Sequence, residues 1–229
     1  MTFELPAESL RARETARALA EAIRPQASEI DRTAAIPAEL ARDLAALGSN
    51  DPMVTVVVVE EIATANAAAS IGLAGGRGGG ALGLSGLRGA RALDDSPRAQ
   101  LTLAAAALGL GRAAMAAALD AVRPTAGIAP AVEKPQWVVA DVATDLDAAR
   151  LLTYKAAGTM ANADIALARL QASAAAQRAV DVAVRVTGAD ALTSGSALER
   201  LARDVRVLSV LLGTEEDQRA IAAEALLPR

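Results

Sequence analysis

Alanine accounts for 60 of the 229 residues of this chain, whereas only Phe3, Trp137 and Tyr154 are aromatic. Alanine has the highest helix propensity of all residues, and strands are usually rich in β-branched and aromatic side chains. A core made of alanine, leucine, valine and isoleucine therefore favours closely packed helices. The composition predicts an all-α protein.

Apolar residues recur every three or four positions along most of the chain, which places them on one face of a helix. In the N-terminal part, this spacing predicts a helix from Ala7 to Asp31, bent at Pro25, and a short helix from Pro37 to Gly48. The β-branched run that follows continues into alanines at helical spacing, so we expect a single helix over residues 53–70. These helices make a predicted N-terminal helical domain over residues 1–71.

A glycine-rich segment separates this domain from the rest of the chain. Residues 72–89 hold nine of the 17 glycines, and ordering so many glycines costs too much backbone entropy for a regular element, so residues 72–96 are interpreted as a linker. Ser96 and Pro97 are typical of a helix start. Five helices with short connections then favour a four-helix-bundle-like domain over residues 97–229. Their expected ranges are Arg98–Val122, Gln136–Asn162, Asp164–Val186, Leu198–Leu211 and Glu215–Leu227.

The charge and the apolar runs limit the partners of this chain. A net charge of −4 and three aromatic residues argue against binding to nucleic acid. We also expect no membrane span, because the longest uncharged stretch, Ile62–Gly76, is short, and Arg112 interrupts the apolar run Leu101–Val122. The N-terminus lacks the basic and apolar pattern of a signal peptide, so a cytoplasmic location is expected.

Because the chain has no histidine and no cysteine, several common kinds of catalytic site are excluded. Ser-His-Asp and Cys-His nucleophiles, Cys/His zinc sites and disulfides are excluded, and so is a di-iron bundle built on Glu-x-x-His pairs. No metal site is predicted. Proton chemistry is left to the carboxylates, to Lys134 and Lys155, and to Tyr154.

Two local patterns are interpreted as structural features without a catalytic or binding role. Residues 78–83 match the G-x-G-x-x-G string of dinucleotide-binding folds, but an alanine-rich helix and not a strand is expected before it, so we interpret it as a flexible connection. Glu60 and Glu61 are adjacent and diverge by about 100° on a helix, so they are not expected to share a ligand. A solvent-exposed edge is their predicted location.

The C-terminal part of the chain resembles the acyl-CoA dehydrogenase family. That family ends with the pattern P-x-E-R-x-x-R-D followed by E-G-T-x-x-x-Q-R, and the residues of this chain that fall in step are Arg200, Arg203, Asp204, Gly213, Thr214, Gln218 and Arg219. The stretch over residues 137–157 is similar to a second family segment, through Ala140, Asp141, Ala149, Arg150 and Tyr154. The N-terminal helices are also similar to the family's opening helices, so the resemblance covers nearly the whole chain except residues 72–96.

The resemblance implies a flavin-dependent fold for the α,β-desaturation of an acyl-CoA, with two departures. The family places a β-barrel between its helical halves, where this chain has only the linker. The family's general base is a glutamate immediately before Gly-Thr, and here that position is Leu212. Other members carry the base near the start of the first C-terminal helix, yet residues 98–101 include no acid. The family motif therefore assigns no catalytic residue, with Glu215 and Glu216 as substitutes that lie three and four residues later.

The family resemblance also implies residues near FAD. Members contact the adenosine and pyrophosphate part of a neighbouring subunit's flavin, and the corresponding residues here are Arg123, Gly127, Gln136 and Gly188. Thr214 and Gln218 belong to the matching C-terminal motif and complete the candidate cofactor-binding set. For Arg123, a role as the positive charge at a helix C-terminus is the competing interpretation.

These implications favour a non-catalytic subunit that pairs with a full-length acyl-CoA dehydrogenase homologue in a dimer or hetero-tetramer. FAD would then belong to the partner's site or be absent, and the substrate would be a steroid or fatty acyl-CoA. Two alternatives stay open at this stage. One is an active short dehydrogenase that binds its own FAD and uses Glu215 or Glu216 as the base, and the other is a flavin-free helical scaffold.

Overall fold

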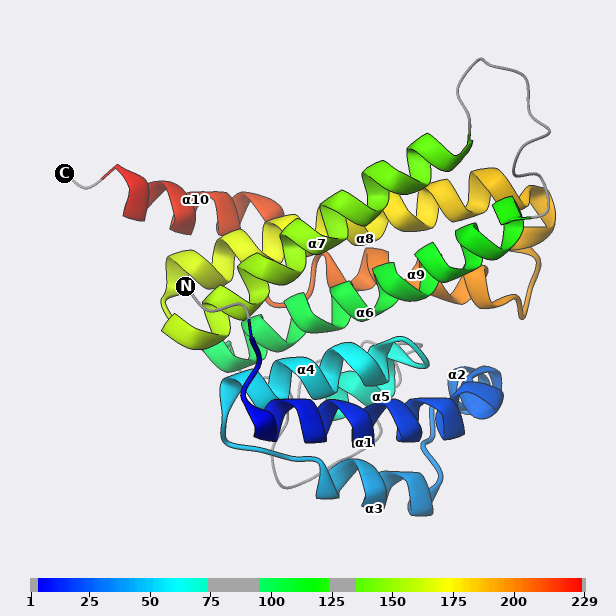
Figure 1. Ribbon diagram of the computed structural model, residues 1–229, viewed down its shortest axis with the longest axis horizontal. Helices are drawn as coiled ribbons and strands as arrows, with labels where there is room; N and C mark the ends of the chain where they lie inside the picture. Colours follow the sequence, from blue (N-terminus) through cyan, green and yellow to red (C-terminus); the bar gives the residue numbers. More distant parts are fainter. Residues whose placement is uncertain (1–3, 74–94, 124–134, 228–229) are drawn as a thin grey trace.

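A computed structural model describes residues 4–73, 95–123 and 135–227 (Figure 1). In these ranges it contains helices and no strand, so the all-α prediction is confirmed. Helices α1 to α5 form a layer that we call the N-terminal layer. Helices α6 to α10 form the bundle, which lies against one side of that layer.

The first helices of the N-terminal layer follow the predicted pattern. The helix α1 (Ala7–Ile23) passes through a short 3₁₀ turn, η1 (Arg24–Gln26), into α2 (Ala27–Thr33). The predicted bend at Pro25 is therefore confirmed, because proline lacks the N–H that an uninterrupted helix needs. The third helix, α3 (Ala38–Ala46), starts one residue after Pro37.

The predicted single helix over residues 53–70 is wrong, because the structure has α4 (Pro52–Ala63) and α5 (Ala67–Gly72) there. Polar side chains cause the break. The Thr64 hydroxyl donates to the carbonyl of Glu61 (2.7 Å), and the Asn66 side chain accepts from the N–H of Ala69 (2.9 Å) as the N-cap of α5. The break turns the chain, so α5 also packs against the bundle.

The bundle contains the helices expected after residue 97. Helix α6 begins at the predicted Ser96 cap, whose hydroxyl accepts from the N–H of Ala99 (3.2 Å). Helices α6, α7 and α8 run antiparallel to their neighbours in sequence, and α10 projects from one end of the bundle (Figure 1). The bounds are α6 (Pro97–Val122), α7 (Pro135–Thr159), α8 (Asn162–Thr187), η4 (Ala189–Leu192), α9 (Ala197–Leu208) and α10 (Glu215–Leu226).

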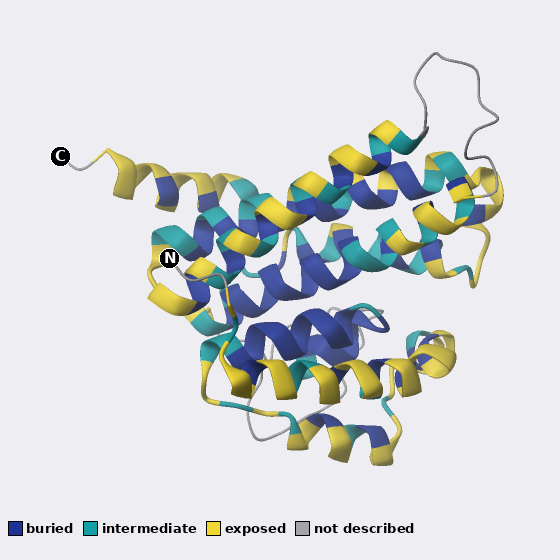
Figure 2. Cartoon of the chain, in the orientation of Figure 1, coloured by how far each residue is buried: buried dark blue, intermediate teal, exposed yellow. Residues whose placement is uncertain are grey.

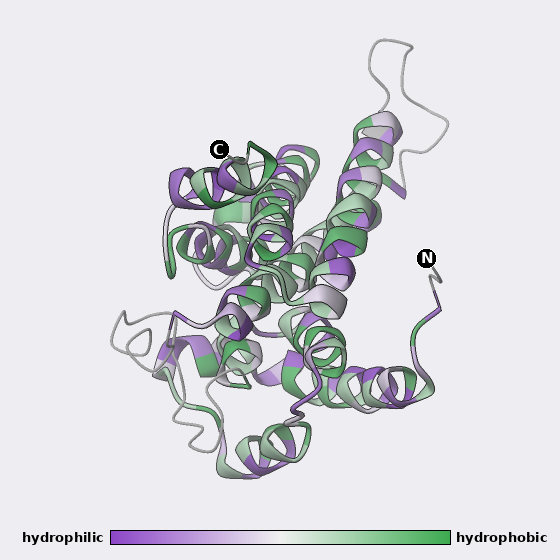
Figure 3. Ribbon diagram, turned by 90° about the vertical axis from the view of Figure 1, so that its left-hand side faces the viewer, coloured by the Kyte–Doolittle hydropathy of each residue, from purple (hydrophilic) through white to green (hydrophobic). Residues whose placement is uncertain are grey.

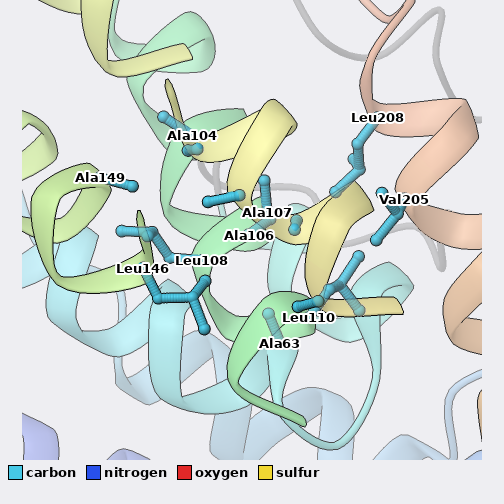
Figure 4. Packing of buried hydrophobic residues seen from close by; sticks show 14 of the residues in the cluster. Ala63, Ala104, Ala106, Ala107, Leu108, Leu110, Leu146, Ala149, Val205 and Leu208 are labelled. Atoms are coloured by element: carbon cyan, nitrogen blue, oxygen red, sulfur yellow. The ribbon is translucent and has the colours of Figure 1, made fainter. Parts of the chain in front are cut away.

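Helix α6 is the central element of the core. Its side chains lie among those of α7, α9 and α4, including Leu146, Val205 and Ala63 (Figure 4). Two glycines of α6 permit close approach. A Cβ atom on Gly109 would lie 2.3 Å from the carbonyl oxygen of Glu60 and 2.5 Å from Cβ of Ala63. A Cβ atom on Gly111 would lie 2.6 Å from a methyl group of Leu146. Small residues therefore set the spacing between α6 and its neighbours.

Helix α6 is more apolar than the sequence analysis expected. Among the described residues it is the one helix long and apolar enough to cross a membrane. However, 72% of its most apolar stretch is buried inside the protein, and α6 and α4 are buried along most of their lengths (Figure 2). Such burial is typical of the core helix of a bundle.

The outer helices differ from these two. Hydrophilic and hydrophobic residues alternate along their surfaces (Figure 3). Helix α10 packs on α8 and buries only Gln218 and Ala222 of its own residues. The segment 74–94, which contains the G-x-G-x-x-G string, lies outside the described residues, so the linker and the domain boundaries around it stay predictions.

Candidate functional site

The position that corresponds to the family's general base lies in the loop between α9 and α10. Leu212 has a left-handed backbone (φ 56°), and Gly213 follows it with φ 110°. The carbonyl oxygen of Leu212 accepts hydrogen bonds from Nε2 of Gln100 (2.7 Å) and from Nη1 of Arg169 (3.2 Å). The loop is thereby tied to the start of α6 and to α8.

Arg169 is the charged member of this group. Its side chain is buried, and it donates to the carbonyl oxygen of Leu211 (2.7 Å) and to Oε1 of Gln100. It forms no ion pair with any carboxylate of the described ranges. Burial lowers the pKa of Arg169 to about 10, while the negative charge of Asp95 acts in the opposite direction. We call Gln100, Arg169, Leu211 and Leu212 the base-position cluster.

The base-position cluster lacks a proton acceptor of suitable pKa. Leu212 is a hydrocarbon, Gln100 is a neutral amide, and a guanidinium stays protonated at working pH. The two regions that the resemblance assigns to the base, position 212 and residues 98–101, therefore meet here through Gln100, and neither includes a carboxylate. Asp95 accepts a hydrogen bond from Gln100 and is exposed at the edge of the cluster.

Sequence reasoning missed Gln100 and Arg169 as members of this site. A signal for Arg169 was present, because it lies on the same helical stripe as the buried residues Ile165, Ala172 and Ala176. An arginine on an apolar stripe indicates a buried polar contact. For Gln100 the sequence carries no comparable signal, since its partner Leu212 is distant along the chain.

The two substitute carboxylates, Glu215 and Glu216, lie in the first turn of α10. Each pairs with Arg219, at 2.7 Å and 3.7 Å respectively. The Glu216 side chain is 81% exposed, and hydrogen bonds from its own backbone N–H and from Thr214 hold its pKa below the ordinary value. Neither side chain contacts the base-position cluster, and both occupy the place where carboxylates complement the helix dipole.

Thr214 and Gln218 act locally in the same turn. Thr214 is the N-cap of α10 and forms a capping box with Asp217. Gln218 is buried, and its Nε2 would lie 3.4 Å from a Cβ atom on Gly213. Both residues thus support the turn that follows Leu212.

The other predicted cofactor residues that the structure describes lie at the opposite end of the bundle. This end is formed by the C-termini of α6 and α8 and the N-terminus of α7 (Figure 1). Because α6 has 26 residues, the two ends are separated by about 39 Å. Arg123 caps α6 and pairs with Asp120 (3.3 Å), and Gly188 ends α8 with φ 93°. Gly127 lies outside the described residues.

One polar atom at this end lacks a partner. Oε1 of Gln136, in the first turn of α7, is buried and accepts no hydrogen bond. Buried polar atoms normally have a partner, so this oxygen fits a donor supplied from outside the described residues. The Arg123 side chain is 77% exposed and suits a phosphate group. These two residues fit one part of a flavin, but the five candidate residues that the structure describes do not surround a single site.

The expectation of an exposed edge at Glu60 and Glu61 is wrong. These residues are 2% and 5% exposed, because α4 lies between α1 and the bundle and has no free face. One arginine of α6 nevertheless pairs with both carboxylates. Nη1 of Arg112 lies 3.1 Å from Oε1 of Glu60 and 3.2 Å from Oε1 of Glu61. The described residues include no group of three or more side chains that could hold a metal ion.

Comparison with curated proteins relates this chain to dehydrogenases of CoA thioesters. It is 34% identical to cyclohex-1-ene-1-carbonyl-CoA dehydrogenase of Geobacter metallireducens, over 46% of this chain and 28% of that protein. It is 33% identical to acyl-CoA dehydrogenase of Bacillus subtilis, over 56% of this chain and 36% of that protein. The matched region thus spans about a third of the length of these relatives.

Solved structures share the fold. Butyryl-CoA dehydrogenase from Megasphaera elsdenii superposes with a TM-score of 0.81 at 17% identity, over 99% of this chain and 100% of that chain. The FAD complex of PigA gives a TM-score of 0.78 at 14% identity, over 99% of each chain. The model of the family "Acyl-CoA dehydrogenase, C-terminal domain" matches residues 95–227, which is more than half of the chain. The chain therefore belongs to the acyl-CoA dehydrogenase family.

Proposed function

We propose that this chain is a non-catalytic subunit that pairs with a full-length, FAD-dependent acyl-CoA dehydrogenase homologue. The partner supplies the flavin site and the general base. This chain supplies a helical bundle whose Arg123 and Gln136 contact the partner's flavin. The acyl-CoA substrate, of the fatty or steroid type, is bound and desaturated at the partner's site.

The observation that supports the proposal most strongly is the chemistry of the base-position cluster. Desaturation of an acyl-CoA needs a group that removes the α-proton, and the loss of a general base costs a factor of about 100 to 10,000 in rate. Leu212 and the helix start over residues 98–101 correspond to the two places where the family carries this group, and neither includes a carboxylate. The Asp95 carboxylate next to Gln100 is exposed, and the buried charge of the cluster, Arg169, is a cation. The cluster is suited to holding a loop in place, not to accepting a proton.

A second observation supports the role toward a partner's flavin. The orphaned oxygen of Gln136 and the exposed guanidinium of Arg123 belong to the same end of the bundle, far from the base-position cluster. A FAD bound within one chain would not reach both ends, since about 39 Å of α6 lies between them. A flavin held by a neighbouring subunit needs only one end. When bound, the flavin accepts the hydride that leaves the substrate.

Co-expression tests this proposal. The chain, carrying an affinity tag, is purified alone and after co-expression with a full-length homologue, and flavin absorbance and acyl-CoA desaturation are measured in each sample. We expect colourless, inactive protein alone and a yellow, active complex after co-expression. Arg123→Ala should weaken FAD retention in the complex about tenfold, as the loss of one charge-assisted hydrogen bond predicts. Arg178→Ala, which removes another exposed arginine of the bundle, is the matched control and should leave retention unchanged.

The other outcomes identify the competing functions. A yellow protein that desaturates acyl-CoA without a partner is an active short dehydrogenase, and Glu215→Gln and Glu216→Gln then test which carboxylate is the base. A protein that stays colourless and unbound in every co-expression is a flavin-free scaffold. Either outcome contradicts the proposed function.

A further inference from the structure

Helix α4 connects the two parts of the fold, and most of its surface is apolar. Its buried side chains are largely valine, such as Val58, which faces α1, and Val59, which faces the bundle. A helix surface made only of valine would pack almost equally well after the helix shifts along its axis. The reason is that every position presents the same side chain to the neighbouring helices. Glu60 and Glu61 are the two buried exceptions on this helix that carry a charge.

Cations from three other helices meet these two carboxylates. Oε1 of Glu60 accepts from Nε of Arg150 (3.0 Å) and Nη1 of Arg112 (3.1 Å). Oε1 of Glu61 accepts from Nη2 of Arg17 (3.2 Å) and lies 3.2 Å from the same Nη1 of Arg112. Arg112 thereby couples both carboxylates, so a change at either one alters the surroundings of the other.

Tyr154 closes the network between the N-terminal layer and the bundle. Its hydroxyl donates to Oε2 of Glu60 (2.9 Å) and accepts from Nη2 of Arg13 (3.2 Å), which belongs to α1. Burial and the neighbouring Glu60 raise the pKa of Tyr154 above its ordinary value, so the hydroxyl stays protonated and able to donate. Asp147, at the exposed edge, pairs with the Arg150 guanidinium (3.1 Å).

Burying two carboxylates is costly, and a buried ion pair adds little net stability compared with well-packed apolar residues. Its best-supported advantage is that it fixes one arrangement among several similar ones. We propose that this network is an ionic lock that seats the N-terminal layer on the bundle in one register and opens as a single unit. The members of this lock, which we call the seam lock, are Arg13, Arg17, Glu60, Glu61, Arg112, Arg150 and Tyr154.

Because the natural chain has no cysteine, introduced thiols can report the opening on each side of α4. Val58→Cys places a thiol against α1, and Val59→Cys places one against the bundle, each with a smaller side chain than valine. The rate at which a thiol reagent labels each cysteine measures how often that side opens. Glu60→Gln should raise both labelling rates by the same factor, about 10- to 100-fold, because it leaves the partly buried Arg112 and Arg150 without a full counter-charge at the buried end of their side chains.

The seam lock also requires that Glu61→Gln raise both rates together. If Glu60→Gln accelerates only the thiol at position 59 and Glu61→Gln only the thiol at position 58, the two carboxylates form separate ion pairs and the proposal is wrong. Asp145→Asn, which makes the same change in the exposed pair with Arg178, is the matched control and should alter neither rate. Tyr154→Phe is expected to raise both rates about 3- to 10-fold through the loss of one hydrogen bond, and unchanged rates would overturn the proposal even if the glutamine variants fail to fold.

Tyr154 is the only tyrosine, so the ultraviolet absorbance of phenolate provides an independent measurement. In an alkaline titration, Tyr154 should ionise only at the pH where the two thiols lose their protection. Glu61→Gln, which does not touch the tyrosine, should lower that pH as well. Ionisation of Tyr154 in its ordinary range with both thiols still protected would contradict a lock that opens as a unit.

Discussion

The seam lock and the base-position cluster both hold arginine side chains against buried polar groups, but they compensate the charge in different ways. Arg169 is itself buried, whereas the arginines of the seam lock are partly exposed and reach inward to buried carboxylates. In the seam lock, two buried carboxylates face four arginines, so each cation has an anionic partner or a hydrogen bond to the tyrosine between them. In the base-position cluster, Arg169 has only carbonyl and amide oxygens as acceptors. A guanidinium bound to neutral oxygens is a weaker arrangement than one bound to a carboxylate.

This difference in charge compensation indicates what each cluster is suited to do. A network of arginines around buried carboxylates has one favourable arrangement and resists change, as expected of a contact that fixes two layers. A cation without an anion keeps a loop in place through its hydrogen bonds, at a cost in desolvation. Removing a residue from each cluster should therefore have unequal effects on stability.

The largest effect is expected for Glu60→Met. The change keeps the side-chain volume similar but leaves Arg112 and Arg150 without their shared carboxylate, so we expect a loss of about 3–5 kcal/mol in the free energy of unfolding. Urea denaturation, followed by circular dichroism, measures it. A loss below about 1 kcal/mol would mean that solvent already compensates these arginines.

A third buried charge extends the comparison, since Asp204 on α9 is 5% exposed and its side chain forms no hydrogen bond or ion pair in the described part of the chain. Burial raises the pKa of Asp204 to about 7, although Arg203 partly opposes this change. The folded state thus holds this proton more tightly than the unfolded state does. The contribution of the Asp204 proton to the free energy of unfolding is therefore fully present below the unfolded pKa of about 3.9, and it is lost as the pH rises through 7.

Asp204→Asn should remove this pH dependence. We expect the variant to be more stable than the natural protein by about 2–4 kcal/mol at pH 8, and to lose most of that advantage at pH 4, where Asp204 is protonated in the folded state and about half protonated in the unfolded state. Denaturation of both proteins at the two pH values measures the difference and cancels the contributions of other carboxylates. An advantage that is the same at both pH values would show that Asp204 does not titrate as its burial predicts.

Arg169→Met tests the base-position cluster directly. The substitution leaves the carbonyl of Leu211 without its donor and that of Leu212 with Gln100 alone, but it also removes a buried cation that has no carboxylate partner among the described residues. Because these two effects oppose each other, we expect a loss of only about 1–2 kcal/mol, smaller than for Glu60→Met. Urea denaturation provides this comparison, and equal losses would mean that the two clusters do not differ in charge compensation.

The sequence predicted most of the fold because its signals are local. Alanine content and helical spacing indicate the helices, and Ser96, Pro25 and the acidic first turn of α10 mark where they start or bend. The break at Asn66 was missed, since a continuous apolar pattern outweighs one polar residue in such reasoning. Asn66 acts through a single cap hydrogen bond, which depends on a backbone turn that spacing does not reveal.

The site was less predictable because its contacts join residues far apart in the sequence. Leu212 was identified by its place next to Gly-Thr, but its contacts with Gln100 and Arg169 depend on how α6 and α8 meet the loop. The burial of Glu60 and Glu61 depends on α4 having neighbours on both sides. A local rule places two adjacent glutamates at a surface, and tertiary packing overrides it here.

The smallest effect is expected for Arg178→Ala, which isolates the role of burial. Arg178 joins α8 to Asp141 and Asp145 of α7, so it resembles the arginines of the seam lock in chemistry, but its side chain and that of Asp141 are 45% and 65% exposed. Exposed ion pairs contribute little, so we expect a change of at most about 0.5 kcal/mol in the free energy of unfolding, and salt should reduce it further. Denaturation in low and high salt measures both quantities. A loss as large as that of Glu60→Met would mean that linking two helices, and not burial, gives an arginine pair its importance in this fold.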